Sequence, residues 1–118
     1  MHVVYEIEEG TNTAVVTLRG ELDAHDAPRL RELLAEAVEQ VASNPGQGEH
    51  RLVLDLTGVA FLDSTVLGTM IGALRRIREA EGAMRVVLPE TPARRIFDIT
   101  GLVPVLDIYP TRAAALAV

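Results

Sequence analysis

The amino-terminal part of the chain has the apolar spacing of paired strands. Residues 3–8 and 14–18 are rich in β-branched side chains, and a turn over 10–12 separates them. This pattern predicts a hairpin, and we expect Gly20 to end its second strand.

A helical pattern follows this hairpin. Either Asp23 or Asp26 is placed to cap a helix, and Pro28 is tolerated in a first turn. The spacing i, i+3, i+4 and i+7 predicts one buried stripe. That stripe comprises Ala27, Leu30, Leu33, Leu34, Ala37, Val38 and Val41. Residues 43–50 hold two glycines and a proline, which predicts an exposed loop.

The second half continues the alternation of strands and helices. Residues 52–56 are nearly all apolar, as expected of a central strand covered on both faces. A helix should begin near Ser64 and end at Gly82. Its buried stripe comprises Val66, Leu67, Met70, Ile71, Leu74 and Ile77.

Shorter elements complete the chain. We expect a strand over 84–88, a helix over 93–99 that ends at Gly101, and a strand over 105–109. Thr111 is placed to cap a short final helix. Strands that alternate with helices predict an α/β fold in a single domain, 1–118. Its mixed, mostly parallel sheet should have about four or five strands, with helices mainly on one face.

Composition narrows the function classes. The chain has no cysteine and no lysine, so disulfides, thiolate metal sites and P-loop chemistry are excluded. Its net charge of −6 disfavours nucleic acid as a ligand. No apolar run approaches the roughly 20 residues that a membrane span needs. We expect a cytoplasmic protein without membrane insertion.

The usual enzyme motifs are also missing. The three histidines, His2, His25 and His50, lack zinc-site spacing, so we predict no metal, no cofactor and no catalytic residue. One competing interpretation places Asp23, Asp55 and Asp63 around a divalent cation, in a small hydrolase or phosphotransferase.

Two glycines need a separate interpretation. Gly68 and Gly72 form a small-x-x-x-small pair on the second predicted helix. Such a pair can mark close helix–sheet packing or a site for a partner helix. We favour the packing interpretation.

The most informative segment is 61–68, where a buried strand leads into a helix that begins with two hydroxyl residues, Ser64 and Thr65. The structural interpretation is a helix cap, in which Asp63 or Ser64 accepts a hydrogen bond from a backbone amide. Such a cap contributes about 1 kcal/mol.

The same segment resembles a family signature. Asp63-Ser64-Thr65-Val66-Leu67-Gly68 is similar to the Asp-Ser-Ser-Gly-Leu-Gly of bacterial anti-sigma factor antagonists in the STAS domain family. The resemblance includes Gly20-Glu21-Leu22-Asp23 before the first helix, Leu54-Asp55-Leu56-Thr57-Gly58-Val59 before the signature, and Gly101-Leu102 near the third helix.

This resemblance implies a phosphorylation switch and not an enzyme. It assigns phosphorylation to Thr65, with Ser64 as the alternative. The partner-binding residues would be Asp23, Asp63, Ser64, Thr65, Val66 and Leu67. Val66 replaces the family glycine and would add a β-branched side chain to the contact surface. The implied partner is an anti-sigma factor serine/threonine kinase; a phosphatase and a homodimer are further expectations.

Physical chemistry supplies a mechanism for such a switch. A phosphate would add about −1.5 to −2 charge beside Asp63 and Asp23, which can spoil docking while the core stays intact. The same family resemblance leaves an alternative function open. STAS domains also serve as scaffold or sensory modules in stress signalling and as transporter-associated subunits.

Overall fold

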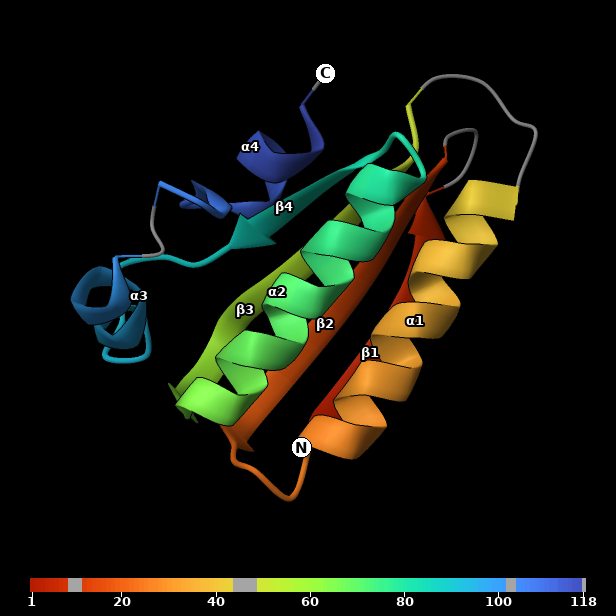
Figure 1. Cartoon of the computed structure of the whole chain (residues 1–118). Coiled ribbons are helices and arrows are strands. Elements are labelled where there is room, and N and C mark those ends of the chain that lie inside the picture. Colours follow the sequence, from red (N-terminus) through yellow and green to blue (C-terminus); the bar gives the residue numbers. More distant parts are fainter. Residues whose placement is uncertain (9–11, 44–48, 102–103, 118) are drawn as a thin grey trace.

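The computed structural model describes residues 1–8, 12–43, 49–101 and 104–117. A five-stranded sheet has the order β1-β2-β3-β4-β5 (Figure 1). Its strands are β1 (His2–Glu8), β2 (Thr13–Leu22), β3 (Arg51–Leu62), β4 (Ala83–Val87) and β5 (Asp107–Tyr109). The helices are α1 (Ala27–Ser43), α2 (Ser64–Glu79), α3 (Arg94–Thr100) and α4 (Arg112–Leu116).

The strand directions confirm the predicted α/β class. β1 is antiparallel to β2, and the pairs β2–β3, β3–β4 and β4–β5 are parallel. Part of the predicted 10–12 turn, most of the 43–50 loop and Leu102 lie outside the described residues. In the part of the chain that is described, no helix combines the length and apolar character needed to cross a bilayer.

The helices are distributed unequally between the two faces of the sheet. α1 and α2 lie side by side on one face, over the main core (Figure 1). α4 covers the other face through Ala115, which packs with Val15, Val53 and Val87. β3 is therefore buried on both faces from Leu52 to Leu56, as its apolar run predicts. The expectation of helices mainly on one face is confirmed.

Side chains from the strands anchor α4 to this second face. Arg112 donates to Asp55 at 2.9 Å and to Thr17 at 2.6 Å. Arg85 donates to the carbonyl oxygens of Ala115 at 2.8 Å and Ala117 at 2.6 Å. Thr111 accepts a hydrogen bond from the amide of Ala114, which confirms the predicted cap.

β2 and β3 extend further than the sequence pattern predicts. The expectation that Gly20 ends the second strand is wrong, because β2 continues through Gly20 to Leu22. Gly20 has φ +94°, and the register between β2 and β3 shifts on either side of it. The bulged register keeps pairing intact as far as Leu22 and Leu62, both of which are buried. β4 pairs with β3 only from Arg51 to Asp55.

The end of α2 also differs from its prediction. Glu81, not Gly82, takes the left-handed conformation, with φ 62°. The amides of Glu81 and Gly82 donate to the carbonyl oxygens of Arg78 and Ile77, which is the Schellman pattern. Gly82 is needed for a different reason, since a Cβ there would lie 2.6 Å from the carbonyl oxygen of His50.

This geometry predicts opposite effects for two neighbouring substitutions. Glu81→Gly should raise the free energy of unfolding by roughly 1 kcal/mol, because glycine adopts a positive φ without steric cost. Gly82→Ala should lower it by about 1–3 kcal/mol, because the added carbon meets backbone. Urea denaturation of both variants measures the two changes. A stabilising Gly82→Ala would contradict the close approach of His50.

Candidate functional site

The parallel pairing of β2 and β3 brings together two segments that are far apart in the sequence. The strands end at the paired residues Leu22 and Leu62. The amide of Asp63 donates to the carbonyl oxygen of Leu22 at 3.1 Å. The segment that begins at Asp23 and the start of α2 therefore lie at the same end of the sheet. Asp23 and the start of α2 had been predicted to belong to one partner-binding surface.

Asp63 forms the predicted cap of α2. Its carboxylate accepts a hydrogen bond from the amide of Val66 at 3.1 Å, and its carbonyl oxygen accepts one from Leu67. Asp63 has extended backbone and is half-buried, as is usual for a residue that precedes a helix. The cap thus falls on Asp63 and not on Ser64.

The hydroxyls of Ser64 and Thr65 are accessible. Both residues are exposed in the first turn of α2. Their side chains make no hydrogen bond to the described residues, whereas the backbone carbonyl of Thr65 accepts one from Thr69 at 3.2 Å. The fold therefore does not use either hydroxyl, and both are open to modification or to a partner.

The expectation that the side chains of Val66 and Leu67 lie on the contact surface is wrong. They are 0% and 3% exposed and belong to the main core. Positions 66, 67 and 70 face the sheet because a helix turns by 3.6 residues, so Val66 occupies a core position. The valine therefore leaves the outer surface of α2 unchanged.

The glycines of α2 lie on its outer side, so the packing interpretation of them is also wrong. Gly68 is exposed and Gly72 half-buried, and a Cβ at either position would meet no atom within 4 Å. Thr65, Gly68 and Gly72 are spaced at i, i+3 and i+7, which places them on one helix face. A partner can approach the backbone of α2 closely along this stripe.

Asp23 is exposed and held by the turn before α1. Its carboxylate accepts from the amide of His25 at 2.9 Å, and its own amide donates to the carboxylate of Asp26 at 3.0 Å. Neither carboxylate accepts a hydrogen bond from an α1 amide in the described chain, so the predicted side-chain cap of this helix is not formed. The turn fixes Asp23 at the edge of the surface that carries Thr65.

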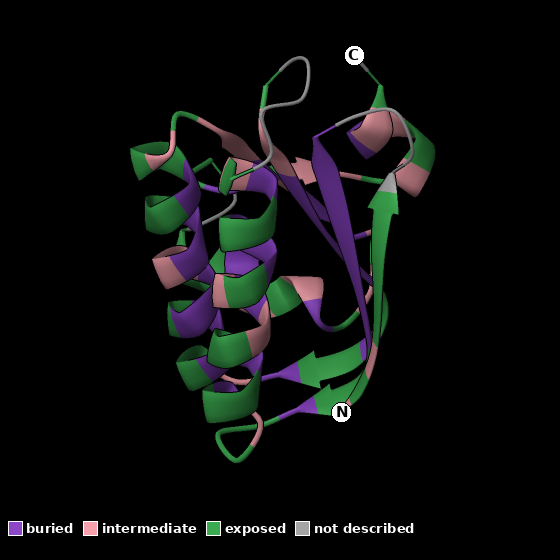
Figure 2. Ribbon diagram, turned by 90° about the vertical axis from the view of Figure 1, so that its right-hand side faces the viewer, coloured by how far each residue is buried: buried purple, intermediate pink, exposed green. Residues whose placement is uncertain are grey.

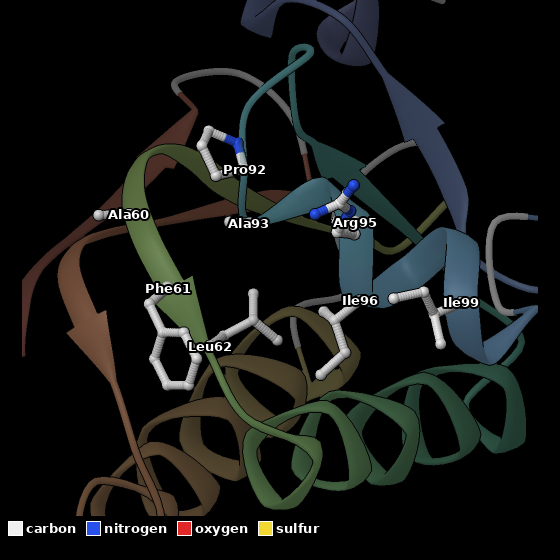
Figure 3. Close-up of a pocket in the computed structure, with 8 residues that line it drawn as sticks. All are labelled: Ala60, Phe61, Leu62, Pro92, Ala93, Arg95, Ile96 and Ile99. Carbon is white, nitrogen blue, oxygen red and sulfur yellow. The ribbon is translucent and has the colours of Figure 1, made fainter.

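An apolar groove beside these residues was not predicted from the sequence. It lies between the end of β3 and α3 and has a volume of about 280 Å³ (Figure 3). Phe61 is 51% exposed and Ile99 is 74% exposed. The lining residues are Ala60, Phe61, Leu62, Pro92, Ala93, Arg95, Ile96 and Ile99. The groove opens where β3 continues beyond β4, and Leu62 connects it directly to Asp63.

Asp55 lies in a different environment from the other two aspartates. It is on the α4 side of the sheet, where Arg112 and the hydroxyl and amide of Thr57 donate to its carboxylate. Among the residues that the structure describes, no group of three acids or histidines could hold a metal ion. The competing interpretation of Asp23, Asp55 and Asp63 as one cation site is therefore wrong.

The environment of Asp55 has a consequence for stability. Burial alone would raise the pKa of this carboxyl, but hydrogen bonds from Thr57 and the charged Arg112 outweigh it and leave the pKa below its ordinary value. A lowered pKa means that the ionised pair stabilises the fold above the ordinary carboxyl pKa. This contribution is lost as the pH falls through the lowered value.

We therefore expect Asp55→Asn to lower the free energy of unfolding by about 1–3 kcal/mol at neutral pH. The difference from wild type should shrink as the pH falls below about 4. Urea denaturation at neutral and acidic pH measures both. The control is Asp107→Asn, an exposed carboxylate 3.8 Å from Arg85, which should have little effect. A difference that persists unchanged in acid would argue against the ion pair.

Known proteins resemble this chain over nearly its whole length. A family model described as the STAS domain matches residues 4–115. The anti-sigma F factor antagonist of Paenibacillus polymyxa is 33% identical over 116 residues, 98% of this chain and 94% of that protein. A solved anti-sigma factor antagonist from Mycobacterium paratuberculosis is 32% identical, with a TM-score of 0.80, and the match covers 98% of this chain and 90% of that one. The Bacillus cell fate determinant SpoIIAA, solved in its phosphorylated form, has a similar fold, with 24% identity, a TM-score of 0.68 and 96% of each chain covered.

Proposed function

The chain belongs to the STAS domain family, and we propose that it is an anti-sigma factor antagonist switched by phosphorylation at Thr65. In the unmodified state it binds an anti-sigma factor serine/threonine kinase, and the sigma factor is released. The observation that carries this proposal is the exposed Ser64–Thr65 pair, whose hydroxyls the fold leaves unused at the start of α2. The similarity to named antagonists over nearly the full length supports it further.

The contact surface combines a polar end and an apolar groove. Asp23, Asp63, Ser64 and Thr65 provide the polar end, and the glycine stripe of α2 lets a partner approach the helix backbone. Phe61 and the residues of α3 provide the apolar side. Interfaces of this type gain most of their affinity from a few apolar anchors, with polar groups around them.

Phosphorylation of Thr65 changes this surface while the fold is retained. The cap of α2 is made by Asp63, so a phosphate on Thr65 breaks no hydrogen bond of the described fold. The helix amino terminus tolerates the added anion. The phosphate sits close to Asp63, two residues before it, and this concentrated negative charge opposes a partner that fits the unmodified surface. A phosphorylated form has been solved for SpoIIAA, a protein of the same fold.

A serine/threonine phosphatase would remove the phosphate and restore binding. The protein would act in the cytoplasm and would bind its partner without catalysing a reaction. The scaffold or transporter-associated alternative has weaker support, because the similar antagonists match nearly full length on both sides.

Substitutions at Thr65 test the switch. Thr65→Glu should weaken binding to the anti-sigma factor kinase at least about tenfold, because the glutamate adds a second negative charge beside Asp63. Thr65→Ala should keep binding and should block phosphate incorporation. Titration calorimetry with the candidate kinase measures the affinity of each variant. Mass spectrometry after incubation with this kinase and ATP locates the phosphate.

The matched control is Ser64→Ala, which should still accept phosphate at Thr65. Equal affinities of Thr65→Glu and Thr65→Ala would remove the support for the switch. Phosphate found on Ser64 alone would move the site by one residue within the same class of protein.

The groove gives a second, independent test of the contact surface. Phe61→Ser should weaken partner binding about tenfold or more, as expected on loss of an apolar anchor. Val105→Ser is the control, since Val105 is also exposed, at 44%, but does not line the groove. Equal losses for the two variants would show that the groove is not part of the interface.

A further inference from the structure

Apolar side chains are arranged differently on α3 than on the two long helices. Figure 2 shows α1 and α2 buried on the side that faces the sheet and exposed on the other side. Of the residues that the structure describes, the large exposed apolar side chains all lie outside α1 and α2. On α3, Phe97 is fully buried in the main core, whereas Ile99 is 74% exposed. The fold therefore leaves an apolar side of α3 uncovered.

This uncovered side forms one wall of the apolar groove. Arg95, Ile96 and Ile99 lie on one face of α3 by their spacing, and all of them line the groove. Phe61 and Leu62 line the opposite wall (Figure 3). Along α3 the lining extends from Ala93 to Ile99, which is roughly 9 Å at the rise of a helix. The groove is therefore elongated, as suits a chain better than a compact ring.

The size of the groove limits the length of such a chain. Its volume is about 280 Å³. A methylene group fills about as much space as a water molecule, roughly 30 Å³, so the groove holds an aliphatic chain of roughly nine carbons. An exposed apolar hollow of this kind is a common mark of a binding site.

Arg95 supplies a positive charge at this groove. It is the charged residue among the described residues of the lining. Its neighbour Arg94 lies 3.8 Å from Glu90 and donates to the carbonyl oxygen of Leu88 at 3.4 Å. Arg95 forms no ion pair within the described chain, not even with Asp98 one turn later. A guanidinium stays charged at every physiological pH, and its planar fork matches the two oxygens of a carboxylate.

We propose that the groove binds an aliphatic carboxylate of about eight to ten carbons. Its chain lies between Phe61 and Ile99, and its carboxylate pairs with Arg95. The apolar lining recognises the chain, and the unpaired guanidinium recognises the head group. A neutral amphiphile of the same length makes the first contact and lacks the second.

The position of the groove gives such a ligand a regulatory role, which rests on the proposed function. Leu62 lines the groove, and the next residue, Asp63, caps α2 beside Thr65. The ligand covers Phe61, which is the proposed apolar anchor for the kinase. The carboxylate and the kinase therefore compete for one surface, and the ligand opposes binding without any covalent change.

Titration of the chain with decanoate, below the concentration at which micelles form, tests the site directly. The expected Kd is about 0.1 mM. Octanoate and hexanoate should bind progressively more weakly, by about threefold to fourfold for each methylene removed. Amide shifts in two-dimensional NMR spectra should be confined to residues 60–62 and 93–99.

Two substitutions separate the head group from the chain. Arg95→Gln should weaken the binding of octanoate about tenfold and leave that of 1-octanol unchanged, because only the anion uses the guanidinium. Phe61→Ser should weaken the binding of both about tenfold, because both bury the chain. The matched control is Arg78→Gln, an exposed arginine of α2 that does not line the groove, which should bind like wild type.

Competition tests the regulatory role. Saturating decanoate should raise the apparent Kd of the chain for the candidate kinase about tenfold. Arg95→Gln should need about ten times more decanoate for the same effect. Saturable binding with an unchanged affinity for the kinase would overturn this role. Because decanoate is titrated with the chain alone, the binding result stands even if the antagonist proposal fails.

Other outcomes would overturn the site itself. One is the absence of saturable binding, and another is equal affinity of wild type and Arg95→Gln for octanoate. A third is a change in the groove amides with protein concentration in the absence of ligand, which would show that a second copy covers the groove.

Discussion

Parallel pairing of β2 with β3, maintained as far as Leu22 and Leu62, is the constraint on which the functional end of the molecule depends. It joins a turn that holds Asp23 to the residue that caps α2, and the amide of Asp63 completes the join by donating to Leu22. The bulges around Gly20 keep the two strands in step over this length. The two segments therefore meet at the same end of the sheet.

α2 separates the residues that stabilise the core from those of the proposed contact surface. Its inner face, which includes Val66 and Leu67, is part of the core, and Asp63 satisfies its first turn. Its outer face presents Thr65, Gly68 and Gly72, and a Cβ added at either glycine would meet no atom within 4 Å. A chemical change on the outer face therefore has few native contacts to disturb, as the proposed phosphorylation of Thr65 requires.

The sequence was sufficient for the order and type of the elements, because each has a strong period and clear caps. Thr111 was predicted as a cap from residue type and position alone, and Asp63 was one of two candidates beside Ser64. The errors at Gly20 and Gly82 have a common cause, since a glycine was assumed to end an element. In the structure Gly20 accommodates a bulge inside a strand, and Gly82 accommodates a neighbouring carbonyl while Glu81 takes the positive φ. Such roles depend on tertiary neighbours that local pattern does not contain.

The same limitation applies to the candidate site. The exposed hydroxyls could be located from the helix start, but the burial of Val66 required the orientation of α2 on the sheet. The groove was invisible because it depends on the unequal lengths of β3 and β4, which meet only as far as Asp55 and Val87. The length of β4 and the sequence at the start of α2 can therefore change independently during evolution. Lengthening β4 by a residue or two would narrow the groove and change which partners fit the proposed surface, while Ser64 and Thr65 at the start of α2 stayed the same. Related chains could in this way acquire distinct partners and remain insulated from one another within a single cell.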